Sequence, residues 1–172
     1  IESFNVSTVT NMAYMFRDCS NTTNIQFPLE FDTSNVVDMS YMFYDCYNLT
    51  QVILRRSQKP KVRLFTGMFY GCNKIEGITL SQATFDSSID ATGMFAEMRN
   101  IKQIYIPQVD YYNSDGKKVI INGMFQHSIR QYDDGDCDLY VKQRFKNYLL
   151  TTSGQADTGL EINFYRITGM PD

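Results

Sequence analysis

Apolar residues recur over the first 125 residues in a pattern centred on the dipeptide Met-Phe. The dipeptide occurs five times, starting at residues 15, 42, 68, 94 and 124, so successive copies are 27, 26, 26 and 30 residues apart. Such a period is typical of a solenoid, in which each repeat buries its apolar side chains only against its neighbours. The sequence therefore predicts a stack of about five units over residues 1–125.

The first half of each unit has apolar residues three or four positions apart, which is the spacing of one face of a helix. We expect a helix of about ten residues or fewer in each unit, which is stable only when neighbouring units cover it. Residues 32–35 offer candidate N-caps for the second helix. The predicted helix faces are Val9, Met12, Met15, Phe16 and Cys19; Val36, Met39, Met42, Phe43 and Cys46; and Val62, Phe65, Met68, Phe69 and Cys72.

The second half of each unit ends in two apolar residues that are two positions apart, which predicts a short strand with one face inward. Stacked units would pair these strands into one parallel sheet, so the predicted fold class is an α/β solenoid of short helix–strand units. The inward pairs are Ile25 and Phe27, Val52 and Leu54, Ile78 and Leu80, and Ile104 and Ile106.

After Phe125 the pattern changes. Residues 136–142 predict a strand, residues 142–150 a helix with Phe145, Tyr148 and Leu149 on one face, residues 151–159 a loop, and residues 160–167 a strand. We expect residues 126–172 to form an α+β capping region, because a solenoid must cover its last edge. The chain starts inside repeat sequence at Ile1, and we expect a neighbouring subunit or a preceding segment to cover that first edge.

Residues 4–16, FNVSTVTNMAYMF, and residues 31–46, FDTSNVVDMSYMFYDC, carry a family resemblance. They are similar to the 26-residue "bacterial surface protein" repeat of the BspA-like leucine-rich repeats, F(D/N)TSNVTNMSxMFxxCxxLTxLDL. The resemblance covers residues 4–107 and weakens in units four and five, where Met98 and Ser128 replace the cysteine. It implies a leucine-rich-repeat-like solenoid, an extracellular or cell-surface location, and partner binding on the outward sheet face.

Composition narrows the function classes. The net charge of −3 predicts no nucleic-acid binding, and no apolar run is long enough for membrane insertion. The chain has one histidine, and it lacks a phosphate-binding loop, a dinucleotide fingerprint, a paired-carboxylate pattern and zinc-ligand spacing. We expect no catalytic residues, no cofactor and no enzyme activity.

The Met-Phe segments place a methionine and a cysteine four residues apart three times, as in Met42 and Cys46. Two soft sulfur ligands on one face could hold copper(I). The preferred interpretation is a core position, because cysteine behaves as a small apolar residue and because units four and five lack it. We expect no metal site and four free thiols; a disulfide between stacked units is the alternative.

Three polar features have a structural and a functional interpretation. We interpret His127 as an exposed edge residue rather than a catalytic base. Residues 133–138 (DDGDCD) predict a solvated loop or a calcium site, although they fail the EF-hand pattern. Asn5, Asn21 and Asn48 lie in Asn-X-Ser/Thr sites and would carry glycans only if a eukaryotic cell secreted the chain.

Two surfaces are candidates for binding. Residues 55–63 predict a charged loop, or a patch for phosphate or acidic glycan, formed by Arg55, Arg56, Lys59, Lys61 and Arg63. The outward sheet positions predict a solvated face or a binding face, with Gln26, Gln51, Ile53, Thr79, Gln103, Tyr105 and Tyr140 as the candidate contact residues.

The leading function prediction is a non-enzymatic extracellular module for adhesion or recognition, which binds protein or glycan through its sheet face. The alternative is a structural component of a larger assembly, such as a phage or viral particle or an appendage. A leucine-rich-repeat architecture alone does not identify the ligand.

Overall fold

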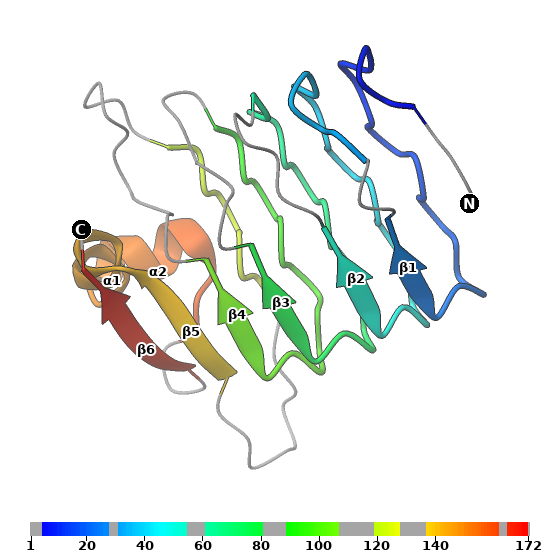
Figure 1. Cartoon of the computed structure of the whole chain (residues 1–172). Helices are drawn as coiled ribbons and strands as arrows, with labels where there is room; N and C mark the ends of the chain where they lie inside the picture. Colours follow the sequence, from blue (N-terminus) through cyan, green and yellow to red (C-terminus); the bar gives the residue numbers. More distant parts are fainter. Residues whose placement is uncertain are drawn as a thin grey trace.

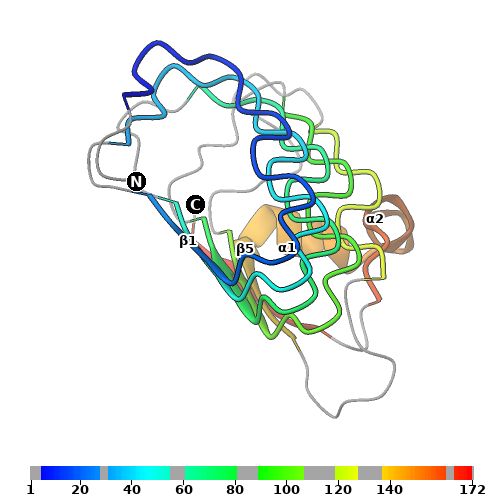
Figure 2. The same cartoon turned by 90° about the vertical axis from the view of Figure 1, so that its right-hand side faces the viewer.

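The computed structural model describes residues 5–27, 31–54, 61–80, 89–106, 119–127, 137–161 and 165–171. Its coils stack one behind the other from the N-terminus to the C-terminus, and their strands lie side by side (Figure 1). Viewed along the stack, the coils superpose, with the strands on one side and zigzag corners on the other (Figure 2). The chain is therefore a β-solenoid-like stack of about four turns. This confirms the predicted solenoid, although about five units were expected.

The strands are short and parallel to their partners. They are β1 (Asn24–Gln26), β2 (Gln51–Ile53), β3 (Gly77–Thr79), β4 (Gln103–Tyr105), β5 (Cys137–Lys142) and β6 (Tyr165–Met170). One sheet pairs β1 with β2, and a second has the order β3-β4-β5-β6. Within the described residues β2 and β3 are not paired, so the prediction of one continuous sheet is wrong at this point.

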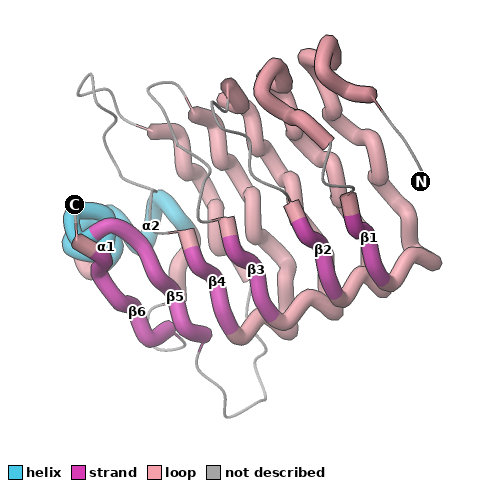
Figure 3. The backbone as a smooth tube through the Cα atoms, viewed as in Figure 1, coloured by secondary structure: helices cyan, strands magenta, loops and turns pink. Residues whose placement is uncertain are grey.

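The Met-Phe segments form corners made of tight turns, and Figure 3 draws them as loops. The predicted helix in each unit is therefore wrong for the described part of the chain. Two positions in each corner adopt the left-handed conformation, such as Tyr14 and Asp18 at φ 63° and 58°, and Gly67 and Gly71 at φ 57° and 71°. A right-handed helix cannot contain such residues, whereas turns whose N–H groups bond the carbonyl three residues back use the same apolar spacing.

Neighbouring corners are joined by backbone hydrogen bonds. The Phe43 N–H donates to the Met68 carbonyl at 3.0 Å, Phe69 to Met94 at 3.0 Å, and Phe95 to Met124 at 2.9 Å. The backbone groups of each corner thus find partners in the next coil, which is why a corner does not need the internal bonds of a helix.

The core is a column of phenylalanine rings inside the stack. Phe43, Phe69, Phe95 and Phe125 are at most 1% exposed, and successive ring centroids are 5.4, 6.1 and 5.9 Å apart. Ring pairs at these separations attract each other beyond the gain from burial alone. The prediction that the Met-Phe pairs form the core is confirmed in the inner coils, although the helix that was expected to carry them is absent.

Beyond the last corner, the chain forms β5, two helices and β6. Helix α1 (Gln143–Leu149) matches the predicted helix, with Phe145 and Leu149 buried. Helix α2 (Thr152–Thr158) lies where a loop was expected. It starts because the Thr151 side chain accepts a hydrogen bond from the Gly154 N–H, and it ends at Gly159, which is left-handed at φ 66°. Strand β6 begins later than the predicted strand.

The end of α2 meets the last corner of the stack. The N–H groups of Gly123 and Phe125 donate to the carbonyls of Asp157 and Thr158, both at 2.8 Å. The last carbonyls of a helix have no partner within the helix, so this contact satisfies both elements.

Candidate functional site

The outward face of the strands carries two rows of side chains in the second sheet. One row aligns Gly77, Gln103, Asp138 and Arg166, and the other aligns Thr79, Tyr105, Tyr140 and Thr168. In the first sheet Asn24 lies beside Gln51, and Gln26 lies beside Ile53. The structure therefore brings Thr79, Tyr105 and Tyr140 together in one row and places Gln103 in the row beside it.

These rows are accessible and are cross-linked by side-chain contacts. Thr79 and Gln103 are exposed, and Tyr105 and Tyr140 are half-buried, with ring centroids 5.5 Å apart. The Arg166 Nε donates to Asp138 Oδ1 at 2.7 Å, and this bond lowers the pKa of the Asp138 carboxyl below its ordinary value. The surface is polar and flat, with ring area concentrated on β4 and β5.

Arg166 and Thr168 extend this face onto β6 and are absent from the sequence prediction. The predicted strand at residues 160–167 includes Arg166 but ends before Thr168, and no outward positions were assigned on it. The alternation of Arg166, Ile167 and Thr168 was the available signal, because it puts two polar side chains on one face of a strand.

The basic segment lies mostly outside the described residues, because Arg55, Arg56 and Lys59 fall in 55–60. Lys61 is exposed, and its Nζ donates to Asn35 Oδ1 in the preceding coil at 2.8 Å. Arg63 is also exposed on this coil. The described part of the segment therefore shows one lysine that contacts the neighbouring coil, and the basic patch stays a prediction.

A tyrosine cluster on the corners was not predicted. Tyr14 stacks on Tyr41 with ring centroids 5.0 Å apart, and Tyr44 stacks on Tyr70 at 4.7 Å. The Arg17 guanidinium lies 5.6 and 5.0 Å from the centroids of Tyr14 and Tyr44. These ring faces are thus used by neighbours within the stack, so the cluster strengthens the corners rather than presenting free faces.

The cysteine thiols are free, as predicted, and none of the four forms a disulfide. Cys46 and Cys72 are fully buried, and their thiols donate to the carbonyls of Phe16 and Phe43 in the preceding coils at 3.0 and 3.1 Å. Burial raises the pKa of the Cys46 thiol to about 11 and that of Cys137 to about 12. These thiols therefore act as buried hydrogen-bond donors and are poor nucleophiles.

His127 is exposed at the edge of the last corner, as predicted. Its Nδ1 lies 2.8 Å from Glu97 Oε1, and Glu97 also accepts a hydrogen bond from Arg99. Burial opposes ionisation of Glu97, but the hydrogen bonds from Arg99 and His127 lower its pKa below the ordinary value. This is an ion-pair cluster on the surface.

Residues 133–136 of the predicted calcium loop lie outside the described residues, and Asp138 lies on β5 with Arg166 as its partner. Among the described residues, no group of three or more His, Cys, Asp or Glu side chains could hold a metal ion.

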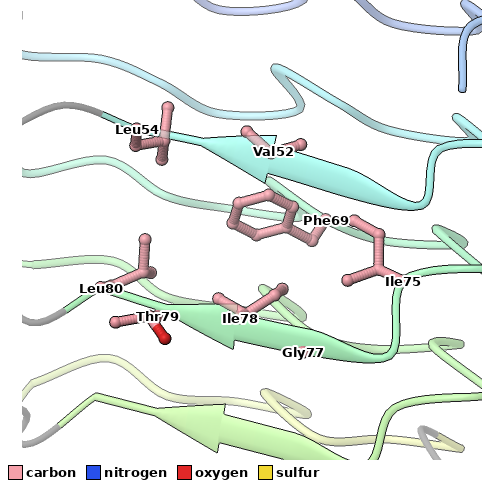
Figure 4. A pocket seen from close by; sticks show the side chains of 8 residues that line it. All are labelled: Val52, Leu54, Phe69, Ile75, Gly77, Ile78, Thr79 and Leu80. Carbon is pink, nitrogen blue, oxygen red and sulfur yellow. The ribbon is translucent and has the colours of Figure 1, made fainter. Parts of the chain in front are cut away.

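A small apolar pocket lies where the two sheets fail to pair. Figure 4 shows Val52 and Leu54 on one side, Ile78 and Leu80 on the other, and Phe69 between them. Its volume is about 10 Å³, which is room for no more than one water molecule. Its side chains are almost all apolar, and the pocket is too small for an organic ligand.

Within the part of the chain that the structure describes, no helix has the length and apolar character needed to cross a bilayer.

Comparison with known proteins identifies a family for the repeat region. No curated protein and no solved structure matched the chain significantly. A family model described as "Mycoplasma protein of unknown function, DUF285" matches residues 1–108, which is more than half of the chain and covers the first four Met-Phe corners. The chain therefore belongs to this DUF285 family of Mycoplasma proteins.

Proposed function

We propose that this chain is a non-enzymatic recognition module, extracellular or at a cell surface, which binds a protein or a glycan through the outward face of its strands. The row Thr79, Tyr105, Tyr140 and Thr168 carries the proposal, because it places hydroxyl groups and ring area on four adjacent strands. Tyrosine gives large contact area at a low cost in conformational entropy. The resemblance of residues 4–107 to BspA-like leucine-rich repeats supports the same face.

The test is a double substitution, Tyr105→Ala with Tyr140→Ala, assayed on a glycan array and on cultured cells. Binding should fall at least about tenfold, because the two rings lie at the centre of the proposed surface. Tyr47→Ala is the matched control, since Tyr47 is an exposed tyrosine outside the strands. Equal binding by the double variant and the control would contradict the proposal.

The proposal includes a capping role for residues 126–172. The hydrogen bonds from Gly123 and Phe125 to Asp157 and Thr158 support it, because they occupy donors that a further coil would use. A chain that ends at residue 127 should aggregate, since its last coil would be left uncovered. A monomeric truncated chain with unchanged stability would contradict this role.

The second candidate is a structural subunit of a larger assembly, such as a phage or viral particle or an appendage. Isolation of the native chain only within ordered particles would favour this candidate over surface recognition.

A further inference from the structure

The second and third coils are bonded to each other on the corner side but not on the strand side. At the corner, the Tyr41 N–H donates to the Thr66 carbonyl at 2.8 Å, and the Phe43 N–H donates to Met68 at 3.0 Å. On the strand side, β2 and β3 lie side by side without forming a ladder (Figure 1). We call this break the seam. It lies inside the stack, with coils on both sides of it.

The following coils show which hydrogen bonds the seam lacks. In the third coil, the Glu76 carbonyl accepts from the Lys102 N–H of the next coil at 2.8 Å. The Leu80 N–H of the same coil donates to the Tyr105 carbonyl at 2.9 Å. The fourth coil makes the two equivalent bonds to the strand that follows it. A carbonyl before each strand and an N–H after it thus join one coil to the next.

In the second coil, Thr50 and Leu54 hold these two positions. Neither the Thr50 carbonyl nor the Leu54 N–H is bonded to a backbone group in the described part of the chain. Across the seam, the backbone groups of Gly77 and Thr79 point away from β4 and toward β2, because successive residues of a strand alternate in direction. Both sides of the seam therefore carry N–H and carbonyl groups without partners among the described residues.

The seam also leaves inward apolar side chains accessible. Val52 and Leu54 are half-buried, whereas Ile104 and Ile106 hold the same positions in the fourth coil and are fully buried. Figure 4 shows Val52 and Leu54 on one side of the seam and Ile78 on the other. A strand edge with open backbone groups and accessible apolar side chains is a template for the addition of another strand.

Gly77 adds an independent observation on the β3 side. It lies inside a strand without a left-handed φ, and an added Cβ would meet no atom within 4 Å. Neither the backbone conformation nor the packing of this chain therefore requires glycine at this position. Glycine weakens a strand, and it often marks a place where another backbone approaches closely.

We propose that the seam is a binding site for an extended polypeptide segment of a partner protein, which inserts as a strand between β2 and β3. Its backbone bonds Thr50 and Leu54 on one side and Gly77 and Thr79 on the other. Its inward side chains are apolar and cover Val52 and Leu54. An extended polypeptide fits because it presents N–H and carbonyl groups to both edges at the spacing of a strand.

This site differs from the recognition surface proposed above, because it uses backbone groups and inward side chains instead of the outward rows. Insertion requires the two coils to separate on their strand side. Each neighbour of an inserted strand lies about 4.8 Å away, so β2 and β3 would stand about 10 Å apart. The corner bonds stay in place and serve as the hinge. The pocket of about 10 Å³ between the two sheets is the same site before it opens.

The test uses a synthetic peptide with the sequence of residues 101–106 (IKQIYI), which contains β4, with acetyl and amide ends. Hydrogen exchange in the full chain is followed by nuclear magnetic resonance. Without peptide, the Leu54 amide should exchange at least about tenfold faster than the Leu80 amide, and the peptide should slow it at least about tenfold. The control peptide is N-methylated at alternate residues, which blocks one edge, and it should bind at least about tenfold more weakly.

Two substitutions at one position give a matched pair. Gly77→Pro removes an N–H that faces the seam, whereas Gly77→Ala keeps it and adds a Cβ in open space. Proline is tolerated on a strand edge whose N–H is outside the ladder. The peptide should bind Gly77→Pro at least about tenfold more weakly than Gly77→Ala. If Gly77→Pro does not fold, the N-methylated peptide on the original chain decides the question.

Three results would overturn the proposal. They are equal exchange of the Leu54 and Leu80 amides in the free chain, no slowing of Leu54 by the peptide up to its solubility limit, and equal binding of the two peptides. The double variant Tyr105→Ala with Tyr140→Ala should bind the peptide as the original chain does. Failure of the outward-face proposal would therefore leave the seam standing, and the reverse also holds.

Discussion

The first and second coils have nearly the same sequence around Met-Phe but different surroundings. Met42 and Phe43 are fully buried, whereas Met15 is 36% exposed and Phe16 is only partly buried. Phe43 stacks between Phe16 and Phe69, whereas among the described residues Phe16 stacks on Phe43 alone. The sequence of a repeat therefore does not determine its burial; the neighbouring coils do.

The same contrast applies to the polar groups. Cys46 and Asn48 donate to carbonyls of the first coil, and Cys19 and Asn21 have no corresponding bond within the described residues. Equivalent substitutions in the two coils should therefore lower the free energy of unfolding by different amounts. These differences test the stacking.

The largest effect should come from Phe43→Ala. Removing a fully buried ring should lower the free energy of unfolding by about 3–5 kcal/mol. Phe16→Ala should cost at least about 1 kcal/mol less, because part of that ring is already in water. Urea unfolding followed by circular dichroism measures both, and equal losses would show that the first coil is as well covered as the second.

A smaller effect should follow from Gly71→Ala. Gly71 has φ 71°, and an added Cβ would lie 2.2 Å from Asp45 Oδ1 of the preceding coil. The strain and the collision together should cost about 2 kcal/mol or more. Gly93→Ala is the control, because Gly93 has φ 58° and an added Cβ would meet only the Ala96 Cβ, at an ordinary contact distance of 3.9 Å. It should cost only about 1 kcal/mol. Equal melting temperatures for the two variants would contradict the contact between coils.

Asn48→Ala should have a smaller effect again. It removes the 2.7 Å hydrogen bond to the Ser20 carbonyl and should cost about 1 kcal/mol. Asn21→Ala should change the free energy of unfolding by no more than about 0.5 kcal/mol, because the Asn21 amide makes no hydrogen bond to another described residue. A larger loss for Asn21→Ala than for Asn48→Ala would reverse the expected order.

The buried thiol of Cys46 should make the free energy of unfolding depend on pH above about pH 8.5, but not near pH 7. In the unfolded chain its thiolate forms above about pH 8.5, whereas in the folded chain burial raises its pKa to about 11. The unfolded state therefore loses its proton first, and stability should fall as the pH rises from about 8.5 to about 11. Cys46→Ala should flatten this fall in urea titrations; an unchanged slope would argue against a buried thiol.

The sequence predicts the core well because a fixed Met-Phe period places equivalent apolar side chains against one another in successive coils. It misassigns the corners because apolar residues three or four apart fit both a helix and a pair of tight turns. Glycines at 67, 71, 93 and 123 were the missed signal, since they occupy the left-handed positions that Tyr14 and Asp18 hold in the first coil. A helix of this kind would not place glycine repeatedly at the same two positions.

The candidate face was predictable only in part. The alternation around Gln103 and Tyr105 places both side chains outward, and the structure agrees. The contribution of β6 was missed because the predicted strand ends at residue 167, before Thr168. Helix α2 was missed because residues 151–159 have no apolar periodicity, although Thr151 and Gly159 are its N-cap and C-cap. The break between β2 and β3 leaves no mark in the repeat pattern, because Val52 and Ile78 keep the inward positions.

The central claim is that the corners are stacked turns joined from coil to coil. It is tested most directly by nuclear magnetic resonance detection of scalar couplings across hydrogen bonds in the isotope-labelled chain. The stacked corner predicts a coupling between the Phe43 amide nitrogen and the Met68 carbonyl carbon, whose N–H and oxygen are bonded at 3.0 Å. A coupling from Phe43 to the Met39 carbonyl, four residues back, would instead show a helix and would contradict this account.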